Sequence, residues 1–322
     1  MNDTIVAIST ALGVGAISIV RLSGKEAIEI VNSCFKGKDL SKVKSHTINY
    51  GHIIDKDEII DEVLVSIMKE PKTYTTEDVV EINCHGGVIS TKRILETMLT
   101  HGARLAEPGE FTKRAFLNGR IDLVKSEAVM DIIDSKSEEA NKIALSQLSG
   151  STSNMIKKFR ESLKQLLASI EVNIDYPEYY DIEVITKEKI SKSIEEMKKD
   201  LEKVINESKN TTLIKEGIKT VIVGRPNVGK SSILNKLLEQ EKAIVTDIAG
   251  TTRDIVEGEI SLDGILLNII DTAGIRSTDD IVEKIGVEKS LSMIDAADLV
   301  VVVLNNNEEL TAEDQEILEK TK

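Results

Sequence analysis

The sequence has no tryptophan, only two cysteines, and only five tyrosines and four phenylalanines among 322 residues. This scarcity of aromatic side chains leaves isoleucine, leucine and valine to build the hydrophobic cores. Cys34 and Cys84 are too few and too far apart for a disulfide framework or a zinc site. We therefore expect a reducing, cytoplasmic environment.

Long apolar runs and an excess of basic residues are also missing. No run approaches the ~20 residues of a membrane span, and residues 1–4 lack the basic stretch and apolar core of a signal peptide. The 41 Lys and Arg face 55 Asp and Glu, which gives a net charge of −14. This balance argues against a protein coated in nucleic acid, because phosphate binding requires a local excess of basic residues. A composition of 41% hydrophobic and 30% charged residues excludes wholesale disorder.

The first of three stretches is residues 1–118, which mix strand-like and helical patterns and predict an α+β domain. Its strand-like runs fall at 15–21, 61–67 and 79–83. Its helical patterns fall at 25–34 and 88–100. Residues 119–216 are the second stretch, with long helical periodicity that is interrupted at Pro177. We expect the many charges of this α-helical domain to form solvated helix faces.

Residues 217–322 alternate strands and helices and predict a partial α/β domain. Strand-like runs at 257–262 and 265–270 flank Asp263-Gly264, which is a strong hairpin signal. Further apolar runs at 219–223 and 298–304 predict buried strands. Length alone suggests about two domains, whereas these textures indicate three.

Residues 224–231 read Gly-Arg-Pro-Asn-Val-Gly-Lys-Ser and match the phosphate-loop pattern GxxxxGK[ST]. Glycines allow backbone N–H groups to turn around phosphate oxygens, and the following helix adds its positive dipole end. Lys230 is expected to reach the β- and γ-phosphates, and the Ser231 hydroxyl to bind Mg²⁺. The motif follows an apolar run and precedes a helical pattern, which is the context that this function requires.

Two later motifs extend this prediction. Residues 271–274 read Asp-Thr-Ala-Gly after an apolar strand, where Asp271 can hold the Mg²⁺ shell and the Gly274 amide can meet the γ-phosphate. Residues 250–254 read Gly-Thr-Thr-Arg-Asp, and one of these threonines can complete the metal shell as a γ-phosphate sensor. The three motifs in this order resemble the first signatures of an Era-like P-loop (Ras-like) GTPase.

The residue after the Asp-Thr-Ala-Gly motif is Ile275, where many GTPases have a glutamine that orients water. A catalytic group must then come from elsewhere, and the downstream carboxylates Glu283 and Asp280 are candidates; either is equally well a surface acid before a helix. Arginine fingers or a monovalent cation near Asn227 are alternatives for stabilising charge. The candidate arginines are Arg253 and Arg276.

Further motifs resemble the TrmE family of bacterial tRNA-modifying GTPases over nearly all 322 residues. They lie at 3–7, 15–24, 77–81, 85–87, 108–118, 122–123, 127–128 and 216–217. The resemblance implies an enzyme that adds an aminomethyl or carboxymethylaminomethyl group to C5 of the wobble uridine of certain tRNAs. It implies a folate one-carbon donor (5-formyl-tetrahydrofolate or a related folate), a homodimer, and a heterotetramer with the FAD-dependent partner MnmG (GidA), without a membrane.

The resemblance also assigns domains and site residues. Residues 1–118 are then a tetrahydrofolate-binding-like dimerisation domain, 119–216 the first part of a helical domain, and 217–322 a truncated G domain. The implied catalytic residues are Glu283, Lys230 and Gly274. The implied GTP contacts are Asn227, Val228, Gly229, Lys230, Ser231, Ser232, Thr246, Asp247, Ile248, Ala249, Gly250, Thr251, Thr252, Asp271, Thr272, Ala273 and Gly274. The implied metal ligands are Ser231 and Thr252 for Mg²⁺, and Asn227, Thr246, Ile248 and Thr251 for K⁺.

The folate site implied by the resemblance consists of Arg21, Glu81 and Arg120. The family usually has lysine at the last position, so the charge is kept but the geometry differs. From the residues alone, Arg21 and Glu81 are more typical of a structural ion pair. Cys84 and His85 are more typical of a packed thiol and a turn histidine than of a metal site.

The sequence reaches Lys322 before an Asn-Lys-x-Asp motif for the guanine base, and before the family's C-terminal Cys motif. We therefore expect a C-terminally truncated chain that hydrolyses GTP poorly. Two other functions remain open. One is an Era-like regulatory GTPase in ribosome or RNA assembly, and the other is a folate-dependent methyl-transferring enzyme with an attached GTPase.

Overall fold

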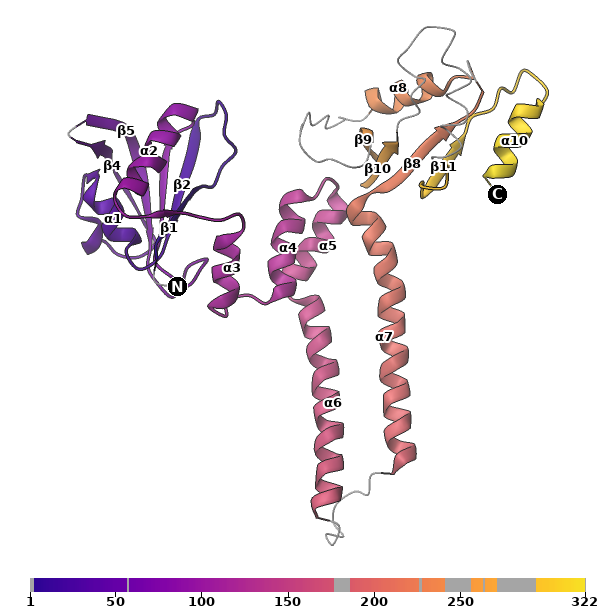
Figure 1. The fold of residues 1–322 in the computed structure, drawn as a ribbon, viewed down its shortest axis with the longest axis horizontal. Helices are drawn as coiled ribbons and strands as arrows, with labels where there is room; N and C mark the ends of the chain where they lie inside the picture. Colours follow the sequence, from indigo (N-terminus) through magenta and orange to yellow (C-terminus); the bar gives the residue numbers. More distant parts are fainter. Residues whose placement is uncertain are drawn as a thin grey trace. The chain divides into compact units, whose positions relative to one another are not determined.

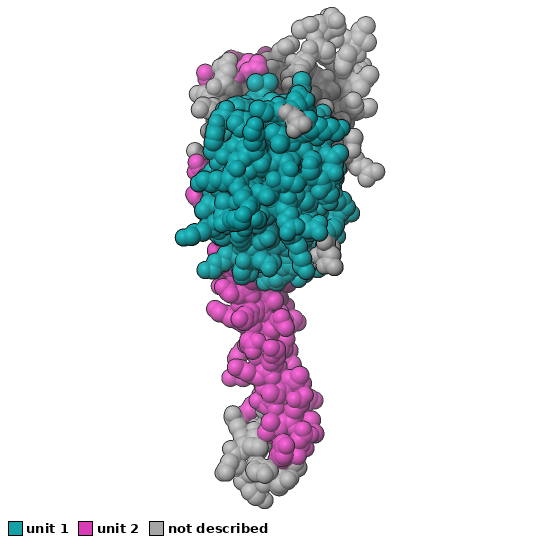
Figure 2. All heavy atoms as spheres, turned by 90° about the vertical axis from the view of Figure 1, so that its left-hand side faces the viewer, with its two compact units in different colours: residues 1–126 teal, residues 127–322 magenta. Residues whose placement is uncertain are grey.

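The computed structural model describes residues 3–56, 58–176, 186–225, 228–240, 256–262, 264–270 and 294–321. The chain divides into two compact units, residues 1–126 and 127–322, which are coloured separately in Figure 2. Each unit is built around its own sheet (Figure 1), in agreement with the predicted α+β first domain, helical segment and α/β region.

Unit 1 contains a seven-stranded sheet of order β3-β4-β5-β6-β2-β1-β7. Its neighbours pair antiparallel, apart from the parallel pair of β1 and β7. The strands are β1 (Ile5–Ile8), β2 (Ile17–Ser23), β3 (Phe35–Lys36), β4 (Thr47–Asp55), β5 (Glu58–Met68), β6 (Val79–His85) and β7 (Arg104–Leu105). The predicted runs at 15–21, 61–67 and 79–83 thus correspond to β2, β5 and β6, with shifted ends, whereas β1, β3, β4 and β7 were not predicted.

The helices of unit 1 are α1 (Ala27–Ser33), the 3-10 helix η1 (Leu40–Lys42), α2 (Val88–Thr100) and α3 (Glu110–Leu117). The pattern at 88–100 predicted α2 at its observed bounds. Residues Thr91, Ile94 and Met98 recur on one helical face and are buried against the sheet. Cys34 and Cys84 are free thiols within this core, and burial raises the pKa of Cys34 to about 12.

Four helices precede the second sheet: α4 (Leu123–Asp134), which crosses the boundary between the units, α5 (Glu138–Leu148), α6 (Ser151–Asp175) and α7 (Lys187–Glu216). Helix α5 packs against α6 and α7. At its C-terminal end α7 is fixed by Lys215, which forms an ion pair with Asp131 of α4 and donates to Gln147 at 3.1 Å. No α6 side chain is buried, so its charged faces are solvated as predicted.

Gly217 turns the chain from α7 directly into the second sheet. Its φ of +84° lies in the region that favours glycine, and a Cβ atom there would stand 2.8 Å from Asn268 Nδ2. That amide nitrogen donates to the Glu216 carbonyl at 2.7 Å. The end of α7 is therefore attached to strand β10 as well as to β8.

The second sheet has the order β11-β8-β10-β9. Its strands are β8 (Ile218–Val223), β9 (Val256–Leu262), β10 (Ile265–Ile270) and β11 (Leu299–Val302). β8 lies parallel to both β10 and β11, while β9 and β10 form the predicted antiparallel hairpin. Helices α8 (Lys230–Gln240) and α10 (Ala312–Lys320) follow β8 and β11 in sequence. None of the helices in the described part of the chain combines the length and apolarity needed to span a membrane.

Candidate functional site

The glycine-rich motif predicted to bind phosphate lies between β8 and α8. Val221 and Val223 are buried in the small core of this sheet, which fixes the end of the strand. Helix α8 begins at Lys230. The Lys230 side chain turns back so that its Nζ donates to the Gly224 and Arg225 carbonyls at 2.8 and 2.7 Å. Burial lowers the pKa of Lys230. The lysine is thus held over the loop by neutral acceptors, which an anion could replace.

Two glycines shape this loop. Gly224 has a φ of +154°, and a Cβ atom at that position would lie 2.3 Å from the Val303 carbonyl oxygen. The loop therefore passes so close to the end of β11 that only glycine fits. Gly229 has a φ of +102° and its carbonyl accepts the first helical hydrogen bond from Ile233.

The second residue of the loop, Arg225, connects the loop to α10. Its Nε lies 2.9 Å from Asp314, whose side chain is almost fully buried, and its Nη2 lies 3.0 Å from Glu308. Asp314 is also the N3 residue of a capping box with Thr311 at the start of α10. Sequence reasoning assigned no role to Arg225, although its place in the motif was noted.

The described residues include only part of the predicted GTP site. The structure describes four of its residues, Val228, Gly229, Lys230 and Ser232. For Ser231 it describes only the position in α8. The other predicted GTP, Mg²⁺, K⁺ and catalytic residues lie outside the described residues: Asn227, Thr246, Asp247, Ile248, Ala249, Gly250, Thr251, Thr252, Asp271, Thr272, Ala273, Gly274 and Glu283. The alternatives Asp280, Arg253 and Arg276 lie outside them as well. Within the described part of the chain, no three His, Cys, Asp or Glu side chains gather as a metal site.

Unit 1 brings Arg21 and Glu81 together. They stand opposite each other on β2 and β6, and Arg21 Nη2 lies 2.7 Å from Glu81 Oε1. Both side chains remain partly exposed, at 30% and 22%. The guanidinium carbon of Arg21 lies 5.7 Å from the centre of the Phe111 ring, a cation–π contact with α3.

Arg120 has a similar environment around Tyr74. Its guanidinium carbon lies 4.8 Å from the Tyr74 ring centre, and its Nη1 donates to the Tyr74 carbonyl at 3.2 Å. The Tyr74 hydroxyl and Thr112 of α3 are hydrogen-bonded at 2.9 Å. Sequence reasoning gave no role to Phe111, Thr112 or Tyr74, although two of them lie in the motif at 108–118.

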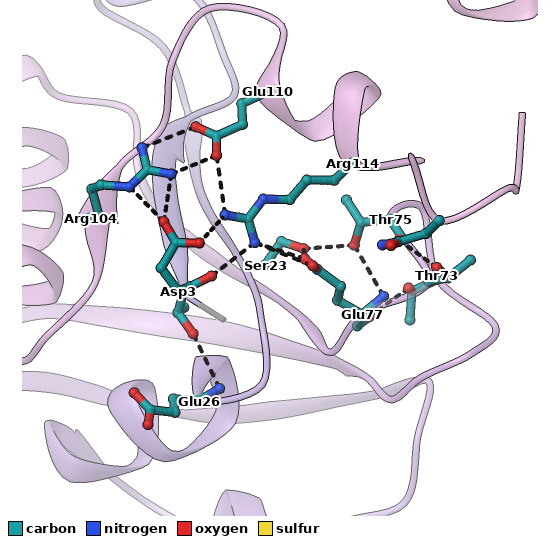
Figure 3. Close-up of polar contacts among 12 residues, drawn as sticks. Asp3, Ser23, Glu26, Thr73, Thr75, Glu77, Arg104, Glu110 and Arg114 are labelled. Atoms are coloured by element: carbon teal, nitrogen blue, oxygen red, sulfur yellow. Dashed lines mark hydrogen bonds and ion pairs between the residues drawn. The ribbon is translucent and has the colours of Figure 1, made fainter. Parts of the chain in front are cut away.

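An ion network surrounds the buried Arg114 of α3 (Figure 3). Arg114 of α3 is 1% exposed and meets three carboxylates, Asp3 at 3.0 Å, Glu77 at 3.1 Å and Glu110 at 3.1 Å. Arg104 joins Asp3 and Glu110 from the other side, at 2.7 and 2.6 Å. The hydrogen bond from Arg104 lowers the pKa of Glu110 to about 2, against the opposing effect of burial.

Cys84 and His85 lie at the end of β6, as a packed thiol and a histidine before the turn into α2. The Cys84 Sγ donates to the Ser18 carbonyl at 3.4 Å within the core. His85 is exposed, and its Nδ1 lies 2.7 Å from Asp61, whose other oxygen accepts from Ser90 at 2.8 Å. The hydrogen bond with Asp61 raises the pKa of His85.

Two family models match this chain. The model described as the GTP-binding protein TrmE N-terminus matches residues 4–120, and that of the MnmE helical domain matches residues 123–320. The second match includes the four-stranded sheet as well as the helices before it. Together the matches define a TrmE-type protein in which unit 1 corresponds closely to the N-terminal family.

Curated relatives agree with this class. Proteins named tRNA modification GTPase MnmE from Streptococcus thermophilus and Ligilactobacillus salivarius are 58% and 56% identical over 317 and 321 residues. One from Staphylococcus aureus is 55% identical over 323 residues. These alignments cover 98–99% of this chain and 69–70% of the relatives. The chain belongs to the MnmE (TrmE) family of tRNA modification GTPases.

Proposed function

We propose that this chain functions as a GTP-hydrolysing tRNA modification enzyme. The reaction is the addition of an aminomethyl or carboxymethylaminomethyl group to C5 of the wobble uridine, with a folate as the one-carbon donor. The observation that carries the proposal is the presence in one chain of two distinct sites. One is a strand–loop–helix with a returning lysine, Lys230, and the other comprises the partly exposed pair of Arg21 and Glu81 together with Arg120 on the ring of Tyr74.

The proposed GTP site is the loop between β8 and α8, in a P-loop G domain of residues 217–322. Lys230 would exchange its two carbonyl acceptors for the β- and γ-phosphates, and the backbone N–H groups of Val228 and Gly229 would supply further donors to the phosphates. Mg²⁺ is assigned to Ser231 and Thr252. K⁺ is assigned to Asn227, Thr246, Ile248 and Thr251, and Glu283 orients the attacking water.

The proposed folate site lies in residues 1–118 together with Arg120. The donor set fits such a ligand, because a carboxylate can accept from pterin N–H groups and guanidinium groups can bind glutamyl carboxylates. Glu81 would take the first role and Arg120 the second, while Arg21, only 2.7 Å from Glu81, would meet the pterin end, where its guanidinium can donate to the ring carbonyl. The aromatic rings beside both arginines provide flat apolar surfaces for a planar ligand. When bound, the folate supplies the one-carbon unit.

The proposed assembly is a cytoplasmic homodimer that forms a heterotetramer with the FAD-dependent partner MnmG (GidA) and acts on tRNA. Residues 119–216 form the first part of the helical domain in this proposal. The net charge of −14 is compatible with a tRNA substrate if the partner and local basic surface supply most phosphate contacts.

Nucleoside mass spectrometry of tRNA tests this function. Deletion of the gene in its host should remove the C5 modification from wobble uridine, and the complete gene should restore it. An unchanged nucleoside profile would contradict the proposal and favour a regulatory Era-like GTPase. The cation assignment has its own test, since K⁺ should stimulate GTP hydrolysis by the full-length protein and Na⁺ should not.

A further inference from the structure

Helix α3 contacts the surroundings of both proposed folate-binding arginines. Phe111, in its first turn, lies under Arg21. Its neighbour Thr112 is hydrogen-bonded to the hydroxyl of Tyr74, whose ring lies under Arg120. The positions of the two guanidinium groups therefore both depend on where α3 lies.

The segment that carries Tyr74 is attached to α3 at two further points. Asn118, at the C-terminal end of α3, donates from Nδ2 to the Thr75 carbonyl at 2.7 Å. Arg114 donates to both Glu77 oxygens, at 3.3 and 3.1 Å. With the bond between Tyr74 and Thr112, these contacts hold residues 74–77 along the length of the helix.

Arg114 also attaches α3 to the segment just before β1. Its Nη1 donates to the Asp3 carbonyl at 2.9 Å, and its Nη2 to the Asp3 carboxylate at 3.0 Å. The remaining carboxylate, Glu110, is one helical turn before Arg114 and is held by Arg104 from β7. One buried guanidinium group thus joins α3 to β1 and to residues 74–77 (Figure 3).

A network of this kind is better suited to fixing geometry than to adding stability. Removing Arg114 and Glu110 from water is costly, and apolar residues of similar volume often stabilise a fold as well as or better than a buried ion pair. The planar guanidinium group, in contrast, directs its donors to fixed positions. Its contacts reach the elements that carry Phe111 and Tyr74, so its geometry is transmitted to the exposed arginines.

We propose that Arg114 is a positioning residue for folate binding. It fixes α3 relative to β1 and residues 74–77, and thereby sets the separation at which Arg21 and Arg120 bind the same ligand. The inference rests on the proposed folate-binding function of this site. Arg114 itself is 1% exposed, so its role in this proposal is exerted through α3.

The test is a double-mutant cycle in which isothermal titration calorimetry measures the binding of 5-formyl-tetrahydrofolate to each variant. Arg114→Lys keeps the charge but cannot reach Asp3 and Glu77 together, and we expect Kd to rise about 5- to 30-fold. In an Arg120→Ala background the same substitution should change Kd less than twofold, because only one of the two groups whose separation it sets is left. Multiplicative effects in the double variant would overturn the inference.

Two companion variants keep the test decisive. If Arg114→Lys fails to fold, Glu77→Gln retains the shape and a hydrogen bond, and it should weaken binding about 2- to 5-fold with the same dependence on Arg120. Arg93→Lys is the matched control, because it makes the same change in the exposed pair of Arg93 and Glu58. It should leave Kd unchanged.

The outcomes separate this inference from the proposed function. A wild-type chain that does not bind the folate contradicts the folate-binding function itself. A wild-type chain that binds, with Arg114→Lys and Glu77→Gln variants that bind equally well, overturns only the positioning role.

Discussion

Arg21 and Glu81 are directly opposite each other on neighbouring antiparallel strands, with their charged groups 2.7 Å apart and both partly open to solvent. A cross-strand pair of this kind stabilises a sheet by about 0.5–1 kcal/mol. The same two side chains are proposed to bind the folate. The pair can therefore have a structural role and a ligand-binding role. Swapping the two residues between the strands distinguishes these roles.

Exchange of these charges should restore stability without restoring folate binding. Arg21→Glu and Glu81→Arg should each lower the free energy of unfolding by roughly 1 kcal/mol, because each places like charges opposite each other. The double variant should regain most of that loss in urea unfolding. Its affinity for 5-formyl-tetrahydrofolate should stay at least about tenfold below wild type, because a charge-assisted hydrogen bond contributes roughly 1.5–3 kcal/mol. Wild-type affinity in the double variant would show that folate binding does not depend on which of the two positions carries the guanidinium and which the carboxylate.

Replacement of Lys230 by alanine should affect nucleotide binding far more than folding. Its described hydrogen bonds go to two loop carbonyls, so its loss should change the free energy of unfolding by less than about 1 kcal/mol. Loss of a charge-assisted contact with phosphate should raise the Kd for a fluorescent GTP analogue by about 30- to 100-fold. Lys236→Ala, on the same helix, is the control, and an equal loss of affinity there would point to general electrostatics.

The link between Arg225 and α10 predicts a graded effect on stability. Asp314→Ala removes both the capping-box acceptor and a buried ion-pair partner, and should destabilise the chain by about 2–4 kcal/mol. Glu308→Ala, at the more exposed end of the same arginine, should change stability by less than about 1 kcal/mol. Urea unfolding measures both values, and equal effects would contradict the importance of burial.

The depressed pKa of Glu110 predicts a loss of stability in acid. Its pKa is about 2 in the folded chain against 4.5 for the ordinary group, so its contribution is complete above pH 4.5 and is lost as the pH falls toward 2. The contribution is on the order of 1–3 kcal/mol. Unfolding measured from pH 6 to 2 should therefore show a shallower acid loss for Glu110→Gln than for wild type. Parallel pH profiles would show that the protonation of Glu110 is not linked to folding.

Local patterns predicted the elements that have one strong signal. The helical pattern of 88–100 predicted α2, and the Asp-Gly turn predicted the hairpin of β9 and β10. The strand β4 was not predicted because Gly51 interrupts its pattern. In the structure a Cβ at Gly51 would lie 2.3 Å from the Phe35 ring, so this glycine is required by a contact with a distant residue.

In the candidate sites, too, local motifs were predictable from the sequence and long-range contacts were not. The spacing of the phosphate-loop motif was sufficient to place Lys230 at the start of a helix. The contacts of Phe111 with Arg21, and of Tyr74 with Arg120, join residues separated by tens of positions, which no local pattern encodes. The motif at 108–118 was identified by its resemblance to the TrmE family, but the contacts that its residues make are evident only in the fold.

The attachment of α7 at Gly217 has a mechanical consequence. Helix α7 contains 30 residues, and at 1.5 Å per residue it is about 45 Å long. Its C-terminal end is fixed to β8 by the chain and to β10 by the hydrogen bond from Asn268. At this length, a rotation of about 5° at the sheet would displace the far end of the helix by about 4 Å. Strand β8 leads directly into the loop of Lys230, so the loop and the base of this long helix share one strand.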